Sequence, residues 1–336
     1  MPPEKIPPGK RGTSRCDRPG DGGPMGIGET GRRLTEETAS QLLARRHIFG
    51  KDASLAYLFL SPILAVLIGL VAYPFFSAIS LSLQDKMVGA PGTFIGFQNY
   101  LTLLQDAIFR KTVVNTVIYT VLGVVLKAIL GMIIALVINE AIRARNLMRA
   151  LCFLPWAFPT LIVALNWKWI YDGTQAGLLN MLLYESGLVS NYVRWLSDVN
   201  LALFSVIVAM VWQGTPFYAM MFLAGMQAIP KELYEAAEVD GASIIQRFVK
   251  ITLPSLTNVI IITMLLSTIW TANNLEFVYI LTGGGPNYAT HIFPTLSYEI
   301  AIASRRLGLG ATVPLMFLPI LVVIILVLTR RMLEEE

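Results

Sequence analysis

The chain has 336 residues, of which 55% are hydrophobic and only 14% are charged, whereas an average soluble domain has roughly 45–50% apolar and about 25% charged residues. The mean hydropathy of +0.61 points in the same direction. So few charged side chains do not cover the surface of a soluble globule of this length. The composition therefore excludes a conventional soluble enzyme and indicates an integral membrane protein.

The formal net charge of +4 and the isoelectric point near 9.0 do not by themselves indicate a nucleic-acid-binding protein. Ten of the 26 lysine and arginine residues lie in the first 51 residues, which is typical of a tail held on the cytoplasmic side of a membrane. The two cysteines, Cys16 and Cys152, provide neither a disulfide framework nor a paired set of metal ligands. We expect no catalytic residue, metal site or bound cofactor in this chain.

Residues 1–54 are rich in proline, glycine and charge and have little apolar content, which predicts a disordered cytoplasmic tail. This stretch is too long and too polar for the charged start of a secretory signal, and the apolar run after it is longer than a signal core. We therefore expect the first apolar segment to be retained as a membrane span.

Six apolar segments follow the tail, and each has the roughly 20 residues that a spanning helix needs. The alternating ten-residue pattern of a membrane barrel is absent, so the sequence predicts an all-α membrane domain over residues 55–336. Prolines inside or beside the segments, among them Pro155 and Pro159, predict kinks or broken turns. The predicted spans are residues 55–83, 112–138, 150–171, 200–224, 255–282 and 309–329.

Lysine and arginine outside the spans predict the orientation. The tail, the linker 139–149, the loop 225–254 and the end of the chain together hold 18 of the 26 basic residues, and the other three loops hold six. Because basic residues concentrate in cytoplasmic loops, we expect both termini in the cytoplasm.

The loop of residues 226–254, between the fourth and fifth spans, is the most informative stretch. Pro230 suits the first turn of a helix, and Gly241 can end that helix in a left-handed turn. A second helix is expected after the turn. The first helix is acidic and carries alanines, whereas a helix lying on lipid headgroups would have lysine and arginine on its polar face. The loop therefore favours a protein partner over the membrane surface.

Within this loop, Glu235-Ala236-Ala237 is followed after three residues by Gly241 and after nine more by Ile251-x-Leu253-Pro254. This spacing resembles the cytoplasmic signature of permease subunits of binding-protein-dependent ABC importers. The stretches LPWAFPTLIVALNWKWIYD (154–172), GLLN (177–180) and LTGGGPNYAT (281–290) are similar to the carbohydrate-uptake branch, of the maltose and glycerol-3-phosphate permease type. The resemblance covers the chain from Leu55 to its end.

The resemblance implies a six-helix permease fold of the type I, maltose-permease-like kind, with a coupling helix in the 226–254 loop. In that family the coupling helix sits in a cleft of a cytoplasmic ATPase subunit and transmits its ATP-driven closure to the membrane helices. Carried over, Gly241 supplies the turn, Glu235 a polar anchor, and the alanines close contact. The residues expected to couple to the ATPase are Glu235, Ala236, Ala237, Gly241, Leu253 and Pro254.

The same resemblance implies several partners in the plasma (inner) membrane of a prokaryote. They are a second homologous permease, two copies of an ABC ATPase subunit that use ATP and Mg²⁺, and an extracytoplasmic solute-binding protein that delivers a sugar or oligosaccharide. The chain itself contains no G-x-x-x-x-G-K-[ST] phosphate-binding loop, so we do not expect it to hydrolyse ATP.

Polar and aromatic residues inside the predicted spans are the candidates for the substrate path, because unpaired polar groups avoid lipid. Amides and carboxylates bind sugar hydroxyls, and aromatic rings stack on sugar faces. Hydrogen bonding between helices is the competing interpretation. The candidates are Asn273, Asn274, Glu276 and Tyr279 in the fifth span and Trp212 and Gln213 in the fourth.

Lys127, deep in the second span, is the most costly charge in the sequence, so it needs a partner, water or headgroup access. We expect it to have a structural role, such as an internal ion pair, more than a substrate contact. Lys168 lies near a span boundary and is expected to extend its amine toward the headgroups.

Two alternatives stay open at this point. The same machinery could import glycerol-3-phosphate or a polyol, although few cations other than Lys127 lie on the path. A stand-alone, ion-driven secondary transporter belongs to a different class, but Glu276 is the only intramembrane carboxylate available for ion coupling and the two halves show no clear repeat.

Overall fold

The computed structural model describes residues 51–140 and 145–334. The described chain is almost entirely helical and divides into two units, the first ending at Val71 and the second beginning at Ala72. The described part of the first unit is helix α2 (Lys51–Val66) and most of a π-helical segment, Leu67–Ala72. Residues 1–50 of the predicted disordered tail lie outside the described residues. Helix α2 begins at Lys51, so the last four residues of the predicted tail, 51–54, are helical.

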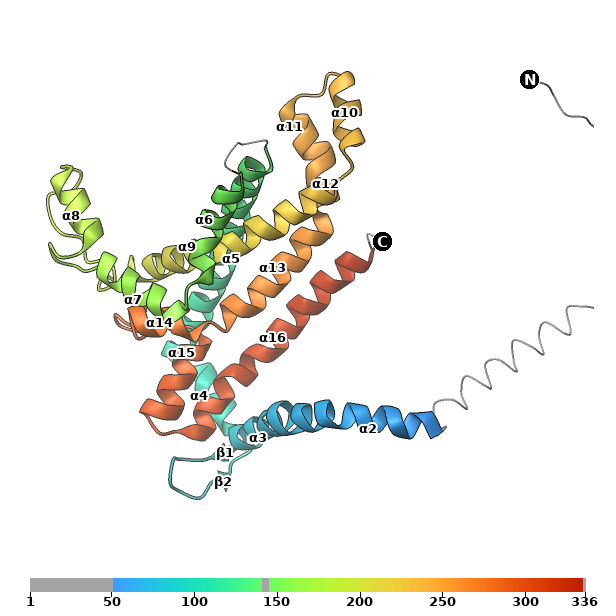
Figure 1. The fold of residues 1–336 in the computed structure, drawn as a ribbon. Coiled ribbons are helices and arrows are strands. Elements are labelled where there is room, and N and C mark those ends of the chain that lie inside the picture. Colours follow the sequence, from blue (N-terminus) through green and yellow to red (C-terminus); the bar gives the residue numbers. More distant parts are fainter. Residues whose placement is uncertain (1–50, 141–144, 335–336) are drawn as a thin grey trace, which may run out of the picture. The chain divides into compact units, whose positions relative to one another are not determined.

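The second unit contains the remaining helices and one small antiparallel sheet, in which β1 (Gln84–Asp85) pairs with β2 (Thr93–Phe94). Figure 1 shows the course of the chain through these elements. The helices are α3 (Tyr73–Ser82), α4 (Gln98–Gln105), α5 (Ala107–Asn139), α6 (Arg145–Ala157), α7 (Thr160–Ile170), α8 (Leu178–Glu185), α9 (Ala202–Ala228), α10 (Lys231–Val239), α11 (Ile244–Arg247), α12 (Leu253–Ser255), α13 (Thr257–Ala272), α14 (Leu275–Leu281), α15 (Phe293–Tyr298) and α16 (Leu307–Glu334). Two further π-helical segments are Phe248–Thr252 and Glu299–Ala303.

Four helical stretches of the described chain are long and apolar enough to cross a membrane, and six spans result if each of two bent helix pairs is counted as one. The four stretches are Tyr57–Ser82, Ala107–Asn139, Ala202–Ala228 and Leu307–Val327. The bent pairs are Asn146–Ala157 with Thr160–Ile170, at 90°, and Ile244–Ser255 with Thr257–Ala272, at 64°.

The predicted third and fifth spans are each interrupted, the third at a proline for which the sequence predicts a kink or broken turn and the fifth at a position where no break is predicted. The first break falls at Pro159, which has no backbone N–H and restricts the residue before it. The second follows Ala272, where α13 ends, and Asn274 caps a new helix by accepting a hydrogen bond from the Phe277 N–H at 3.2 Å. The range 255–282 is therefore two helices, α13 and α14, and not one.

Helices α5 and α9 form the centre of the second unit, and they pack against each other along most of their lengths. Their close approach depends on glycine, because a Cβ atom on Gly131 would lie 2.4 Å from the Tyr218 Cβ and one on Gly123 would lie 2.4 Å from the Met210 Cε. Small residues at helix contacts are typical of membrane proteins, since van der Waals packing holds their helices together.

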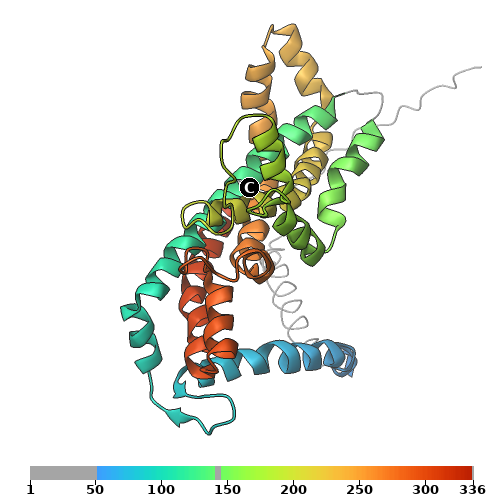
Figure 2. The same cartoon turned by 90° about the vertical axis from the view of Figure 1, so that its left-hand side faces the viewer.

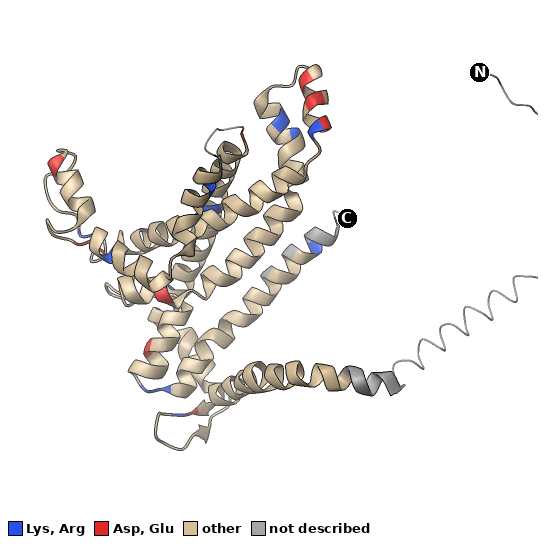
Figure 3. Cartoon of the chain, viewed as in Figure 1, with Lys and Arg blue, Asp and Glu red and all other residues tan. Residues whose placement is uncertain are grey.

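The outward faces of the long helices are apolar and exposed. On α5, for example, the exposed side chains include Val114, Val117, Val121, Ile129 and Ile133. Figure 3 shows that the long helices carry few charged side chains, whereas charges gather on α10, α11 and the connecting segments. An exposed apolar surface of this extent is a liability in water, so we expect these faces to contact lipid or other subunits.

Candidate coupling hairpin and polar cavity

Helices α10 and α11 form a hairpin (residues 230–247, the α10–α11 hairpin) at one end of the second unit. Figures 1 and 2 both place it at the same end as the last turn of α5 and the first turn of α6. The figures place α14 and α15 away from that end. The hairpin therefore lies on the same side as the start of α6, a helix that begins at the basic residue Arg145.

The sequence predicts the local structure of the hairpin correctly. Helix α10 begins directly after Pro230, and Gly241 adopts φ +75°, the left-handed conformation that favours glycine. The Ala242 N–H donates to the Ala237 carbonyl at 2.9 Å, which satisfies a carbonyl at the end of the helix. The predicted second helix, α11, begins after Ser243, whose hydroxyl accepts from the backbone N–H of Gln246 at 3.3 Å.

One hydrogen bond anchors the hairpin to the membrane helices. The hydroxyl groups of Tyr234 and Thr252 lie 2.9 Å apart, and Tyr234 packs on a buried cluster that includes Phe222 and Leu256. This contact joins α10 to the segment that leads into α13.

The tip of the hairpin is solvent-exposed and apolar. Val239 is 88% exposed, Ile244 is 76% exposed and Ile245 is 75% exposed. No residue of α10 is buried, and all six residues predicted to couple to an ATPase are exposed except Ala237, which is half-buried. The hairpin thus presents apolar side chains next to the acidic residues of α10, an arrangement that fits a protein surface.

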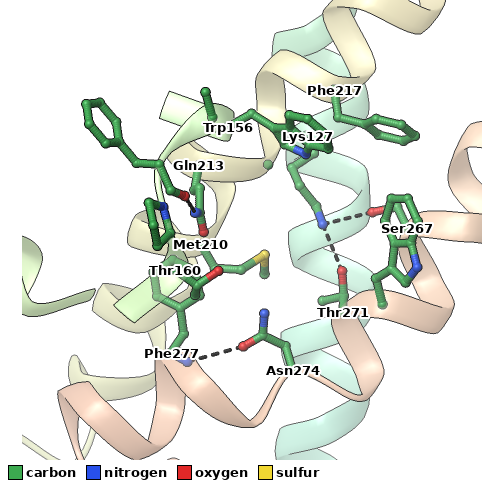
Figure 4. A pocket seen from close by; sticks show the side chains of 15 residues that line it. Lys127, Trp156, Thr160, Met210, Gln213, Phe217, Ser267, Thr271, Asn274 and Phe277 are labelled. Atoms are coloured by element: carbon green, nitrogen blue, oxygen red, sulfur yellow. Dashed lines mark hydrogen bonds between the residues drawn. The ribbon is translucent and has the colours of Figure 1, made fainter. Parts of the chain in front are cut away.

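A second feature is a cavity of about 440 Å³ (the polar cavity) lined by residues of α5, α6, α7, α9, α13 and α14 and by the α6–α7 break. Figure 4 shows the 15 residues that line it. Its wall combines aromatic rings, hydroxyl groups, two amides and one lysine. The lining residues include Lys127, Trp156, Gln213, Ser267, Trp270, Thr271 and Asn274.

The structure brings together two of the six predicted path residues, Gln213 and Asn274, which both line the polar cavity. The other four do not line it. Asn273 donates to the carbonyl of its own helix at Ile269, and Glu276 is exposed. Tyr279 packs edge-on against Tyr298 with ring centroids 5.0 Å apart, and Trp212 packs edge-on against Trp167 at 5.8 Å.

Lys127 is the cavity residue for which the sequence analysis favoured a structural role. Its side chain is 4% exposed, and its Nζ donates to the hydroxyls of Ser267 and Thr271, each at 2.8 Å. Within the described residues the ion pairs are Arg247 with Glu238 and His291 with Glu299, so the expected internal ion pair of Lys127 is not formed there. The partners of Lys127 are hydroxyl groups one helical turn apart on α13.

Sequence reasoning missed the aromatic wall of the polar cavity. Trp156 and Trp270 lie far apart in sequence, and the 90° break between α6 and α7 helps to bring Trp156 to the cavity. The sequence feature that could have indicated these two residues is their position near helix breaks: Trp156 lies close to Pro159, and Trp270 lies close to Asn274.

The ionisable groups of His291 and Asp172, both outside the spans, have shifted pKa values. Burial lowers the pKa of His291, whose Nε2 lies 2.7 Å from a Glu299 carboxylate oxygen that opposes the shift. Hydrogen bonds from the Thr174 hydroxyl and backbone lower the pKa of Asp172. Neither group lies in the polar cavity.

A mostly helical membrane protein with an exposed helical hairpin at one end and a polar cavity among its helices has the architecture of a membrane permease. Residues 107–334 match the family model "Binding-protein-dependent transport system inner membrane component". The chain belongs to this family. It is the permease of such a transporter, a multi-pass component of the inner membrane and not its catalytic part.

Among the curated relatives that are more than 30% identical to this chain, two have names that specify what they transport. One is the trehalose/maltose transport system permease protein MalF of Thermococcus litoralis, 35% identical over 250 residues, 74% of this chain and 84% of the relative. The other is the sulfoquinovosyl glycerol transport system permease protein SmoG of Agrobacterium fabrum, 32% identical over 265 residues, 77% of this chain and 84% of the relative.

A solved structure supports the fold. The chain is similar to a chain of a bacterial ABC transporter involved in the import of the acidic polysaccharide alginate, with a TM-score of 0.74 and 23% identity, covering 87% of this chain and 98% of that chain. The match extends over nearly the whole solved chain, so the expected ABC importer permease fold is confirmed.

Proposed function

We propose that this permease is one membrane half of an ATP-driven importer for a sugar or oligosaccharide. The observation that carries the proposal is the identity of 35% and 32% to permeases whose names specify trehalose and maltose in one case and sulfoquinovosyl glycerol in the other. The aromatic and amide groups of the polar cavity support a carbohydrate, because aromatic faces and amides together bind sugar rings.

The α10–α11 hairpin is the proposed contact with the ATPase. Its exposed apolar side chains, Val239, Ile244 and Ile245, would be buried in a cleft of that subunit, beside the exposed Glu235. ATP and Mg²⁺ would be bound and used by the ATPase and not by this chain. The left-handed turn at Gly241 would give the hairpin a fixed shape with which to transmit force.

The path from the hairpin to the polar cavity is short in sequence and helical over most of its length. Helix α11 continues through the π-helical segment Phe248–Thr252 and α12 into α13, with a 64° bend at Leu256. Helix α13 carries Ser267 and Thr271, which hold Lys127 at the cavity wall. A movement of the hairpin would therefore move one wall of the cavity, which is how we expect ATP hydrolysis to drive alternating access.

The proposed complex contains a second homologous permease, two ATPase copies and an extracytoplasmic binding protein. The exposed apolar faces of α5 and other helices provide surface for a second membrane subunit. Placing the hairpin in the cytoplasm puts the end of α5 and the start of α6 there as well, in agreement with the basic-residue count that places both termini inside.

Co-purification tests this proposal. The chain would be tagged, solubilised gently from its native membrane and analysed for associated proteins, and the purified complex would be reconstituted for uptake. We expect a second permease and an ATPase to co-purify and sugar uptake to require ATP. A chain that purifies alone and drives uptake from an ion gradient without ATP would contradict the proposal and support a secondary transporter.

A further inference from the structure

Lys127 is the one charged side chain among the 15 described residues that line the polar cavity. It lies in the middle of α5, and its side chain is 4% exposed. A lysine at this depth of a membrane span is costly and is seldom retained without a function.

Three helices fix the position of the Lys127 ammonium: α5, which carries the residue, and α9 and α13, which contact its side chain. On α9, Gly214 leaves room for the side chain, since a Cβ atom there would lie 2.6 Å from the Lys127 Cδ. On α13, Ser267 and Thr271 each accept a hydrogen bond of 2.8 Å from the Nζ. An ammonium group has three donors, so the two hydroxyls use two of them and one is left, and the Tyr218 ring lies with its centroid 5.8 Å from the Nζ.

The charge of Lys127 is not neutralised by the described part of the chain. The ion pairs there involve Arg247 with Glu238 and His291 with Glu299, and no aspartate or glutamate lines the polar cavity. Hydroxyl groups solvate an ammonium but do not balance its charge. A cavity with low-dielectric walls and a single positive group attracts anions.

A second donor faces the same space. The Asn274 Oδ1 accepts from the Phe277 N–H, so the other side-chain atom of the amide is the Nδ2 donor, which Figure 4 shows directed into the cavity. An oxyanion only accepts hydrogen bonds, whereas a sugar hydroxyl both donates and accepts. Two donors in this position therefore suit an oxyanion, while Trp156 and Trp270 supply faces for the sugar ring.

We propose that Lys127 makes the polar cavity selective for a carbohydrate that carries an oxyanion, either a carboxylate or a phosphate group. This inference rests on the proposed function, because it specifies the cargo of that importer. Lys127 is then a binding residue, in contrast to the structural role expected from the sequence.

Equilibrium dialysis of the purified membrane complex, without its binding protein, tests the inference. Two matched pairs of radiolabelled probes are used: cellobiouronic acid with cellobiose, and trehalose 6-phosphate with trehalose. We expect the acidic member of at least one pair to bind at least about tenfold more tightly than the neutral member, corresponding to about 1.4 kcal/mol. Preference in the first pair assigns a carboxylate, and preference in the second assigns a phosphate.

The substitution Lys127→Gln should remove the preference by weakening the acidic probe and leaving the neutral one nearly unchanged. Lys168→Gln is the matched control, because the Lys168 Nζ donates to the Ile280 carbonyl and does not line the polar cavity; it should keep the full preference. Retention of the preference in Lys127→Gln would overturn the assignment to this residue.

The wild-type comparison stands even if Lys127→Gln fails to assemble. A wild-type complex that binds the neutral members as tightly as the acidic ones, or binds no acidic member, overturns the inference. Failure of the proposed function is recognised separately, since that would appear as uptake without ATP or as absence of an ATPase from the purified complex.

Discussion

Gly241 is the residue at which the α10–α11 hairpin reverses direction, and its φ of +75° is a conformation that costs most other residues about 1–2 kcal/mol. No atom lies within 4 Å of the position that a Cβ atom would take. Backbone conformation and not space is therefore what selects glycine here.

This distinction gives a prediction at the residue scale. Gly241→Val should uncouple ATP hydrolysis from uptake, because a β-branched residue would force the turn into another conformation, whereas Gly241→Asn should retain most coupling, since asparagine tolerates the left-handed region. Both rates would be measured on the complex in proteoliposomes. Equal uptake by the valine and asparagine variants would show that the turn conformation is not required.

His291 gives a pH prediction. Burial lowers its pKa below the ordinary value of about 6.5, so as pH falls through 6.5 the unfolded chain takes up a proton that the folded chain does not. The free energy of unfolding should therefore be independent of this group above pH 7 and should decrease as pH falls from 6.5 toward the folded-state pKa.

Thermal unfolding of the complex at pH 7.5 and pH 5.5 measures this effect. The variant His291→Gln, which keeps a donor for Glu299, should lose less stability between the two pH values than the wild type. An identical loss in both proteins would mean that other groups cause the pH dependence.

At the scale of elements, the break between α13 and α14 sets one wall of the polar cavity. Asn274 has two roles there, because its oxygen caps α14 and its amide nitrogen faces the cavity. Asn274→Asp keeps the capping oxygen and removes the donor, whereas Asn274→Leu removes both.

We expect Asn274→Leu to cost about 1 kcal/mol of folding stability through loss of the cap, and Asn274→Asp to cost less. Both should reduce uptake, the aspartate variant most strongly for an anionic cargo. Thermal unfolding and initial uptake rates would be compared. Normal uptake by the stable aspartate variant would place Asn274 outside the substrate path.

The packing of α5 on α9 gives a further prediction for these elements. Gly131→Val should lower stability by about 1–3 kcal/mol, because its side chain would collide with Tyr218 and the Ala219 backbone. Gly69→Ala is the control, since no atom lies within 4 Å of its added Cβ position. Similar melting temperatures for the two variants would argue against close helix contact at Gly131.

In the whole molecule, one run of helices from α11 to α13 connects the hairpin to one wall of the polar cavity. Helix α13 reaches from the bend at Leu256 to the cavity residues Ser267 and Thr271, and the Tyr234–Thr252 contact fixes the hairpin to the segment before α13. This connection is what the proposed coupling of the cavity to an external ATPase requires.

The first 30 residues are expected to contribute nothing to this connection. They lie outside the described residues, and their composition predicts disorder. Deletion of residues 1–30 should leave ATP-dependent uptake unchanged in a proteoliposome assay. Loss of complex assembly after this deletion would show that the tail has a structural role.

Apolar length, proline at a helix start and glycine at a helix end act locally, so the sequence is enough to predict the membrane class, the helical segments and the hairpin turn. Which polar residues share a cavity depends on how helices that are far apart in the chain pack together. Gln213 and Asn274 meet there, whereas Asn273, Glu276 and Tyr279 do not, because the break at Asn274 and the packing of α5 on α9 set their directions. The hydroxyl partners of Lys127 likewise lie 140 and 144 residues away in sequence. A contact between residues so far apart cannot be predicted from a local sequence pattern.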